Sequence, residues 1–147
     1  MSAQPLPDRA AILRLIPHQG ASCLIDAVIE WDAERIVCIS EGHRAPDHAL
    51  RRQDRLSPLV LIEYGAQAMA VHAALLAASE GRFAERRLLV STQAVELDCA
   101  DVALLGSPLH IHAERRFADA AGALYGFEIF SADHRCAWGR VGVLRGG

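Results

Sequence analysis

The chain has 147 residues, a length typical of one domain that buries its own apolar core, and we expect a single domain over residues 1–147. Hydrophobic residues make up 52% of the sequence and charged residues 22%, which excludes a disordered chain. The formal net charge of −3 argues against a nucleic-acid-binding protein.

The first third of the sequence predicts a short helix and a β-hairpin. Asp8 is a good N-cap for the apolar helical pattern of residues 9–16. Two β-rich runs, residues 22–31 and 35–42, flank the polar "DAE" and predict the hairpin. The N-terminus has no apolar run and is not a signal peptide, so we expect a cytoplasmic protein.

A polar segment, residues 43–58, predicts an irregular loop, and loops of this length in small domains often carry function. The next run is the most apolar of the chain. Its Ser-Pro pair, residues 57–58, suits the start of a helix that continues to about Ser79. This run is long enough to cross a bilayer, but Glu63, Gln67 and His72 interrupt it, so we expect a buried helix and no membrane.

Four strand-like runs follow the helix: residues 88–97, 107–117, 123–131 and 136–144. A helix that is apolar nearly all round must be covered on nearly all sides. A curved antiparallel sheet would cover most of it, and a partner subunit would cover the rest. The sequence therefore predicts an α+β fold.

Glu63 and Gln67 lie four residues apart and so share one stripe of the helix. His72 lies about half a revolution away and cannot be the partner of Glu63 within the helix. Two interpretations of Glu63 stay open: a carboxylate bound by backbone amides or by an arginine, and a protonated carboxyl that acts as a general acid. In either case, free amides at the helix N-terminus are expected to polarise a bound carbonyl.

The other chemically active side chains have structural interpretations. His72 is expected in the core, and His18 and His134 in turns. His110 and His112 would share one face of a strand, but without a nearby cysteine or acidic pattern we expect no metal site. The four cysteines form no Cys-x-x-Cys pair and are expected to be reduced thiols.

Two segments resemble a known family. "LIPHQGASCLIDAVIEWD", residues 15–32, is similar to the opening segment of 3-hydroxyacyl-acyl-carrier-protein dehydratases, and "LVLIEYGAQAMAVHAALLA" resembles their central helix. The resemblance is strongest to a divergent branch, the dehydratase-like proteins of aryl-polyene and xanthomonadin-type pigment clusters. It implies the hot-dog fold, in which a curved antiparallel sheet wraps one long helix and two subunits pair.

The resemblance implies dehydration of a 3-hydroxyacyl thioester to the trans-2-enoyl thioester, with Glu63 as the acid and an imidazole as the base. No metal or redox cofactor is implied, because the acyl group rides on the phosphopantetheine of acyl carrier protein or coenzyme A. The His-Phe-Pro-Gly run that carries the family's base is missing here. The imidazole must then come from His43 or His48, and we prefer His43, which follows a strand directly.

Substrate-binding candidates are Gln67 and a loop cluster of Arg51, Arg52 and Arg55, with Arg44 nearby. The arginines could contact the phosphate of phosphopantetheine or an acidic carrier protein, or they could simply form a solvated basic loop. Two other functions stay open. The chain could be a hot-dog acyl thioesterase, or a non-catalytic subunit that pairs with an active hot-dog dehydratase. The sequence leaves both homodimer and heterodimer possible.

Overall fold

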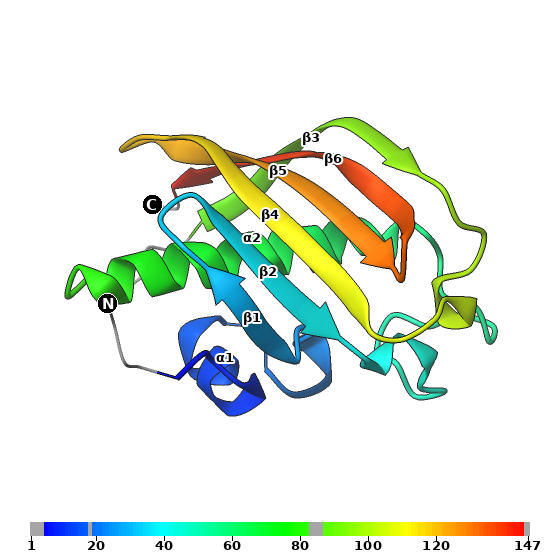
Figure 1. The fold of residues 1–147 in the computed structure, drawn as a ribbon. Coiled ribbons are helices and arrows are strands. Elements are labelled where there is room, and N and C mark those ends of the chain that lie inside the picture. Colours follow the sequence, from blue (N-terminus) through cyan, green and yellow to red (C-terminus); the bar gives the residue numbers. More distant parts are fainter. Residues whose placement is uncertain (1–4, 18, 83–86, 146–147) are drawn as a thin grey trace.

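The structure is a computed structural model, and it describes residues 5–17, 19–82 and 87–145. One long helix, α2 (Val60–Ser79), lies across the concave side of a single six-stranded antiparallel sheet (Figure 1). A short helix, α1 (Arg9–Leu15), packs against α2. The predicted α+β layout of the hot-dog fold is confirmed.

The N-terminal elements follow the expected order. Asp8 caps α1 by accepting a hydrogen bond of 3.0 Å from the backbone amide three residues on. The hairpin consists of β1 (Ala27–Trp31) and β2 (Arg35–Ser40). Its turn is closed by Asp32, whose carboxylate accepts two backbone amides at 2.8 and 2.9 Å. The hairpin prediction is confirmed.

Helix α2 begins with a tight turn. The amide of Val60 donates to the carbonyl of Ser57 at 3.0 Å, an i→i+3 bond, so regular α-helix starts two residues later than the Ser-Pro pair predicts. At the other end Gly81 adopts a φ of 70°, and the amide that follows it reaches the carbonyl of Ala77 at 2.8 Å. This left-handed glycine ends the helix close to the expected position.

The remaining strands are all antiparallel, and their order in the sheet is β1-β2-β4-β5-β6-β3. All four strands predicted after the helix are confirmed. They are β3 (Arg87–Leu97), β4 (Leu109–Ala118), β5 (Gly122–Ser131) and β6 (His134–Arg145). The edge strands of this sheet are β1 and β3.

The core lies between α2 and the concave face of the sheet. On β4 the apolar residues alternate inward and are buried, while His110 and His112 share the outer face as predicted. The helix approaches β5 very closely at Gly65, where an added Cβ would lie 2.9 Å from Cγ of Phe127. Any larger residue at position 65 would push the helix away from the sheet.

One stripe of α2 is left half-exposed by the sheet. It contains Ile62, Glu63, Ala66, Ala70 and Ala73, which recur at helical spacing. The helix is long and apolar enough to cross a membrane, but 56% of its apolar window is buried against the rest of the chain. Helix α2 is therefore the core helix of the domain, and the half-exposed stripe is the part that its own sheet does not cover.

Candidate functional site

Glu63 and Gln67 form a hydrogen-bonded pair in the first half of α2. The side-chain amide of Gln67 donates to Oε1 of Glu63 at 3.2 Å and to the carbonyl of Ser22 at 2.8 Å, and its Oε1 accepts the amide of Leu24 at 2.8 Å. Gln67 is almost fully buried, whereas Glu63 is half-buried. Gln67 therefore spends both of its N–H groups within the chain, and it orients Glu63 on the half-exposed stripe.

The backbone amides at the start of α2 are not free. The amide of Leu59 donates to Oγ of Ser57 at 3.2 Å, and those of the next three residues each donate to a carbonyl three residues earlier, at 3.0–3.2 Å. In this tight first turn the backbone N–H groups that a helix N-terminus usually leaves without a partner are already hydrogen bonded. The expectation that these amides polarise a bound carbonyl is therefore wrong.

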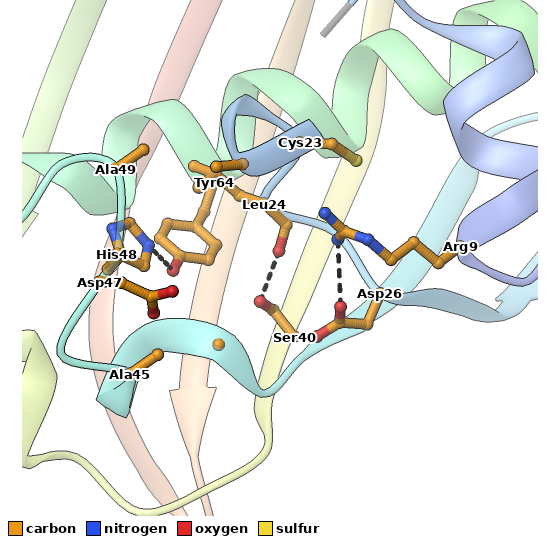
Figure 2. A pocket seen from close by; sticks show the side chains of 12 residues that line it. Arg9, Cys23, Leu24, Asp26, Ser40, Ala45, Asp47, His48, Ala49 and Tyr64 are labelled. Atoms are coloured by element: carbon orange, nitrogen blue, oxygen red, sulfur yellow. Dashed lines mark hydrogen bonds and ion pairs between the residues drawn. The ribbon is translucent and has the colours of Figure 1, made fainter. Parts of the chain in front are cut away.

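A cavity of about 230 Å³ opens beside α2, between the N-terminal segment and the loop that follows β2 (Figure 2). Tyr64 and His48 reach into it from the helix and the loop, and Ser40 lies at the end of β2. Arg9 and Asp26 line the other side, joined by an ion pair of 3.2 Å. The cavity thus gathers side chains from five separate segments of the chain.

His48 is hydrogen bonded through both ring nitrogens. Its Nε2 lies 3.0 Å from Oη of Tyr64, and its Nδ1 accepts the backbone amide of Leu50 at 3.0 Å. Burial lowers the pKa of His48, and the positive charge of Arg51 acts in the same direction. The ring is therefore neutral at physiological pH.

Tyr64 is fully buried, and burial raises the pKa of its hydroxyl to about 12, although hydrogen bonding with Ser40 acts in the opposite direction. The hydroxyl of Ser40 donates to the carbonyl of Leu24 at 2.5 Å. Tyr64 is thus an uncharged hydroxyl group next to His48, and it comes directly after Glu63 in the sequence.

His43 lies in a 3₁₀ turn, Gly42–Arg44, immediately after β2. Its side chain is fully buried, and it does not line the cavity. Nε2 donates to the carbonyl of Leu105 at 2.9 Å, whereas Nδ1 has no hydrogen-bond partner in the part of the chain that the structure describes. Burial lowers the pKa of His43. His43 follows β2 directly, as expected, but it has no exposed surface through which to meet a substrate.

The structure does not bring the predicted catalytic groups together within one chain. Gln67 donates a hydrogen bond to Glu63, whereas the hydrogen bonds of His43 and His48 go to Leu105, Tyr64 and Leu50. The cavity contains His48 but not Glu63. The predicted pairing of Glu63 with His43 or His48 is therefore not made through a direct hydrogen bond.

The predicted arginines bind mostly to their own loop. Arg51 donates to the carbonyls of Ala45 and Asp54, both at 3.1 Å. Arg52 donates to the carbonyl of Ala49 at 3.2 Å and to that of Arg51 at 2.8 Å. Arg55 is exposed. These contacts brace the irregular segment after β2, and Arg55 keeps the most freedom to meet a partner.

His72 is the buried histidine that the sequence predicts, and His134 is the first residue of β6. His72 is fully buried and bonds to Tyr125 at 2.5 Å and to the carbonyl of Asp32 at 2.8 Å. His134 adjoins the β5–β6 turn, while His18 lies outside the described residues. All four cysteines are free thiols. Within the described ranges, no three His, Cys, Asp or Glu side chains gather where they could hold a metal ion.

Sequence reasoning missed Tyr64, Ser40, Arg9 and Asp26 as members of the cavity. Arg9 and Asp26 are 17 residues apart, and His48 and Tyr64 are 16 apart, so no local pattern connects them. The only available signal was the position of Tyr64 beside Glu63 in "IEYGAQ".

Among solved structures, the chain is similar to the dehydratase heterocomplex ApeI:P from Xenorhabdus doucetiae, with a TM-score of 0.82 and 20% identity over 92% of this chain and 91% of that chain. It is also similar to a hypothetical thioesterase with coenzyme A from Streptococcus pneumoniae, with a TM-score of 0.58 and 10% identity over 82% and 84% of the two chains. The PaaI protein of the E. coli phenylacetic acid degradation operon gives a TM-score of 0.58 and 17% identity over 80% and 81%. These likenesses show the hot-dog fold.

Among curated protein sequences, none matches the chain significantly. The family model of the ApeP dehydratase, described as ApeP-like, matches residues 10–146. Because this match spans nearly the whole sequence, the chain belongs to the ApeP-like dehydratase family.

Proposed function

We propose that this protein is a subunit of a dehydratase that removes water from a 3-hydroxyacyl thioester on acyl carrier protein and yields the trans-2-enoyl thioester. The observation that carries the proposal is the family match over residues 10–146, together with the position of Glu63 on the half-exposed stripe of α2. The reaction fits fatty-acid-like, polyene or pigment biosynthesis, and a cytoplasmic protein.

Glu63 is the proposed general acid. An imidazole takes the proton from C2 of the acyl chain, the electrons of that C–H bond form the C2=C3 double bond, and the hydroxyl leaves C3. Protonated Glu63 gives its proton to the departing hydroxyl, so that water is released, and it is then reprotonated from solvent or from the imidazolium. Gln67 holds the carboxyl in place through its bond of 3.2 Å.

A second hot-dog subunit completes the proposed site. Glu63 lies on the stripe of α2 that the sheet leaves half-exposed, and this stripe is otherwise formed by apolar side chains that a partner would bury. The ApeI:P structure, to which this chain is similar, is itself a heterocomplex. Pairing along this stripe would enclose Glu63 and shield it from water, which strengthens its hydrogen bonds with the substrate.

Acyl carrier protein is the proposed carrier, with coenzyme A as the other source of the same phosphopantetheine thioester. Arg55 is the arginine of the loop best placed to meet the acidic surface of a carrier protein, because it is exposed and, unlike Arg51 and Arg52, its side chain donates no hydrogen bond to the described residues. Neither the phosphopantetheine arm nor the thioester requires a metal or redox cofactor for this elimination.

A thioesterase is the second candidate function, and a specific observation favours it: a hypothetical thioesterase with coenzyme A is among the similar structures. In that case Glu63 would activate water against the thioester carbonyl. Mass spectrometry of the assembled protein with 3-hydroxyacyl and saturated acyl carrier-protein thioesters separates the two. Loss of water from the hydroxyacyl thioester is the expected result. Release of free acid would favour the thioesterase, and no turnover in the presence of the partner subunit would overturn both.

A further inference from the structure

The protonation of His48 is fixed by its hydrogen bonds. The backbone amide of Leu50 can only donate, so Nδ1 of His48, 3.0 Å away, must accept and carries no hydrogen. A neutral imidazole then has its single hydrogen on Nε2. A charged ring would place two N–H groups against each other at Nδ1, so this geometry also opposes protonation.

The other nitrogen of the ring faces Tyr64. With its hydrogen on Nε2, His48 donates to Oη of Tyr64 across 3.0 Å, and the two rings lie stacked with an interplanar angle of 27°. Tyr64 is fully buried in the wall of the cavity, and Ser40 commits its own hydrogen to the carbonyl of Leu24. The orientation of the His48 ring is therefore fixed by Leu50 at Nδ1 and by Tyr64 at Nε2.

A general base must offer a free lone pair to the proton that it removes. The only lone pair of neutral His48 lies on Nδ1 and points at the amide of Leu50, while the nitrogen beside Tyr64 already carries a hydrogen. We propose that His48 acts in this subunit as a hydrogen-bond donor and not as the base of the reaction. Tyr64 is the positioning residue: its hydroxyl accepts the hydrogen bond from Nε2 and so orients the ring.

This inference rests on the proposed function and sharpens it. His43 is fully buried, and one of its nitrogens is committed to Leu105, so it does not replace His48. Neither imidazole of the loop after β2 then acts as the base that works with Glu63, and this base must come from another histidine of this chain or from the partner subunit.

Nitrogen-15 NMR of the labelled protein tests the tautomer without any substrate. We expect His48 at pH 7.5 to show an unprotonated Nδ1 and a protonated Nε2, with its signals assigned by their loss in His48→Gln. In Tyr64→Phe, which keeps the ring and removes the hydroxyl, the Nε2 hydrogen should exchange with water faster. A hydrogen on Nδ1, or a charged ring, in the wild type would overturn the proposal.

Kinetics of the assembled pair supply the second test. A glutamine at position 48 can still donate to Tyr64 but cannot take up a proton, so we expect His48→Gln to lower the dehydration rate by less than tenfold. Removal of a general base costs about 10²–10⁴-fold. A loss of that size in His48→Gln would contradict the proposal. If the wild-type pair dehydrates nothing, the proposed function fails, while the NMR result still decides the tautomer.

Discussion

Gln67 donates a hydrogen bond of 3.2 Å to Glu63 one turn earlier in α2, and the same side chain joins the helix to the backbone of Ser22 and Leu24. One buried amide therefore does two things. It holds the carboxyl of Glu63 in one orientation, and it fixes the segment before β1 against the helix. Stability and activity should both depend on this residue.

Replacement of Gln67 by alanine leaves the carbonyl of Ser22 and the amide of Leu24 without their partner in a buried region. Because each lost bond of this kind costs about 1–3 kcal/mol, we expect Gln67→Ala to lower the free energy of unfolding by about 2–4 kcal/mol. Urea denaturation measures the change. Gln19→Ala is the matched control, since Gln19 also donates to two backbone carbonyls but is exposed, and it should cost less than about 1 kcal/mol. Equal losses in the two variants would contradict this account.

Gly65 marks the closest approach of α2 to the sheet. An added methyl group would meet the ring of Phe127 at 2.9 Å, and overpacking of this kind costs about 1–3 kcal/mol. Alanine gains about 1 kcal/mol of helix propensity over glycine, so the net loss in Gly65→Ala should be up to about 2 kcal/mol. Thermal or urea unfolding checks it. Phe127→Leu in the same chain should relieve part of the clash, and a Gly65→Ala protein that is more stable than the wild type would refute the packing argument.

Stability should fall as the pH is lowered from 7.5 to 5.5. Burial lowers the pKa values of His43, His48 and His72 in the folded protein from the ordinary value of 6.5. Below about pH 6.5 the unfolded chain therefore binds more protons than the folded chain, and the free energy of unfolding decreases. Urea denaturation at both pH values measures the loss.

The matched variants for this pH dependence are His72→Gln and His134→Gln. The first removes a buried histidine and should make stability less dependent on pH. The second removes an exposed histidine and is the comparison for the loss of an imidazole that is not buried. A wild-type protein that is equally stable at pH 7.5 and 5.5 would show that these rings are not held neutral.

The cysteines should be poorly reactive in the folded protein. Cys23, Cys38 and Cys136 are buried, and burial raises the pKa of Cys38 to about 12. Cys99 is only half-buried, although burial also raises the pKa of its thiol. Alkylation at pH 8 followed by peptide mass spectrometry should therefore find slow modification at Cys99 first, because the thiolate is the reactive form. Faster labelling of Cys38 than of Cys99 would contradict the packing of β2.

Much of the fold could be predicted from the sequence because its signals are local. The N-cap at Asp8, the alternation along β4 and the apolar run of α2 each act over a few residues, and each predicted element is present. The Ser-Pro pair predicts the start of α2 two residues early, because the i→i+3 turn after Ser57 has no distinctive sequence pattern.

The site was harder to predict because it depends on contacts between distant segments. The sequence identified Glu63 and its neighbour Gln67 on one stripe, and the structure joins them. It could not show that Arg51 donates hydrogen bonds to carbonyls of its own loop, or that His48 is hydrogen bonded to Tyr64 and not to Glu63. Such choices depend on how the irregular segment after β2 folds back on the helix, which no periodic pattern encodes.

The central claim is that Glu63 supplies the proton to the departing hydroxyl, and Glu63→Gln tests it most directly. A glutamine at position 63 can still accept the hydrogen bond from Gln67 but cannot act as an acid. We measure dehydration of a 3-hydroxyacyl carrier-protein thioester by the assembled pair, with the exposed Glu96→Gln as control. We predict a fall of about 10²–10⁴-fold for Glu63→Gln and no change for Glu96→Gln. Dehydration at the full rate by Glu63→Gln would contradict the account.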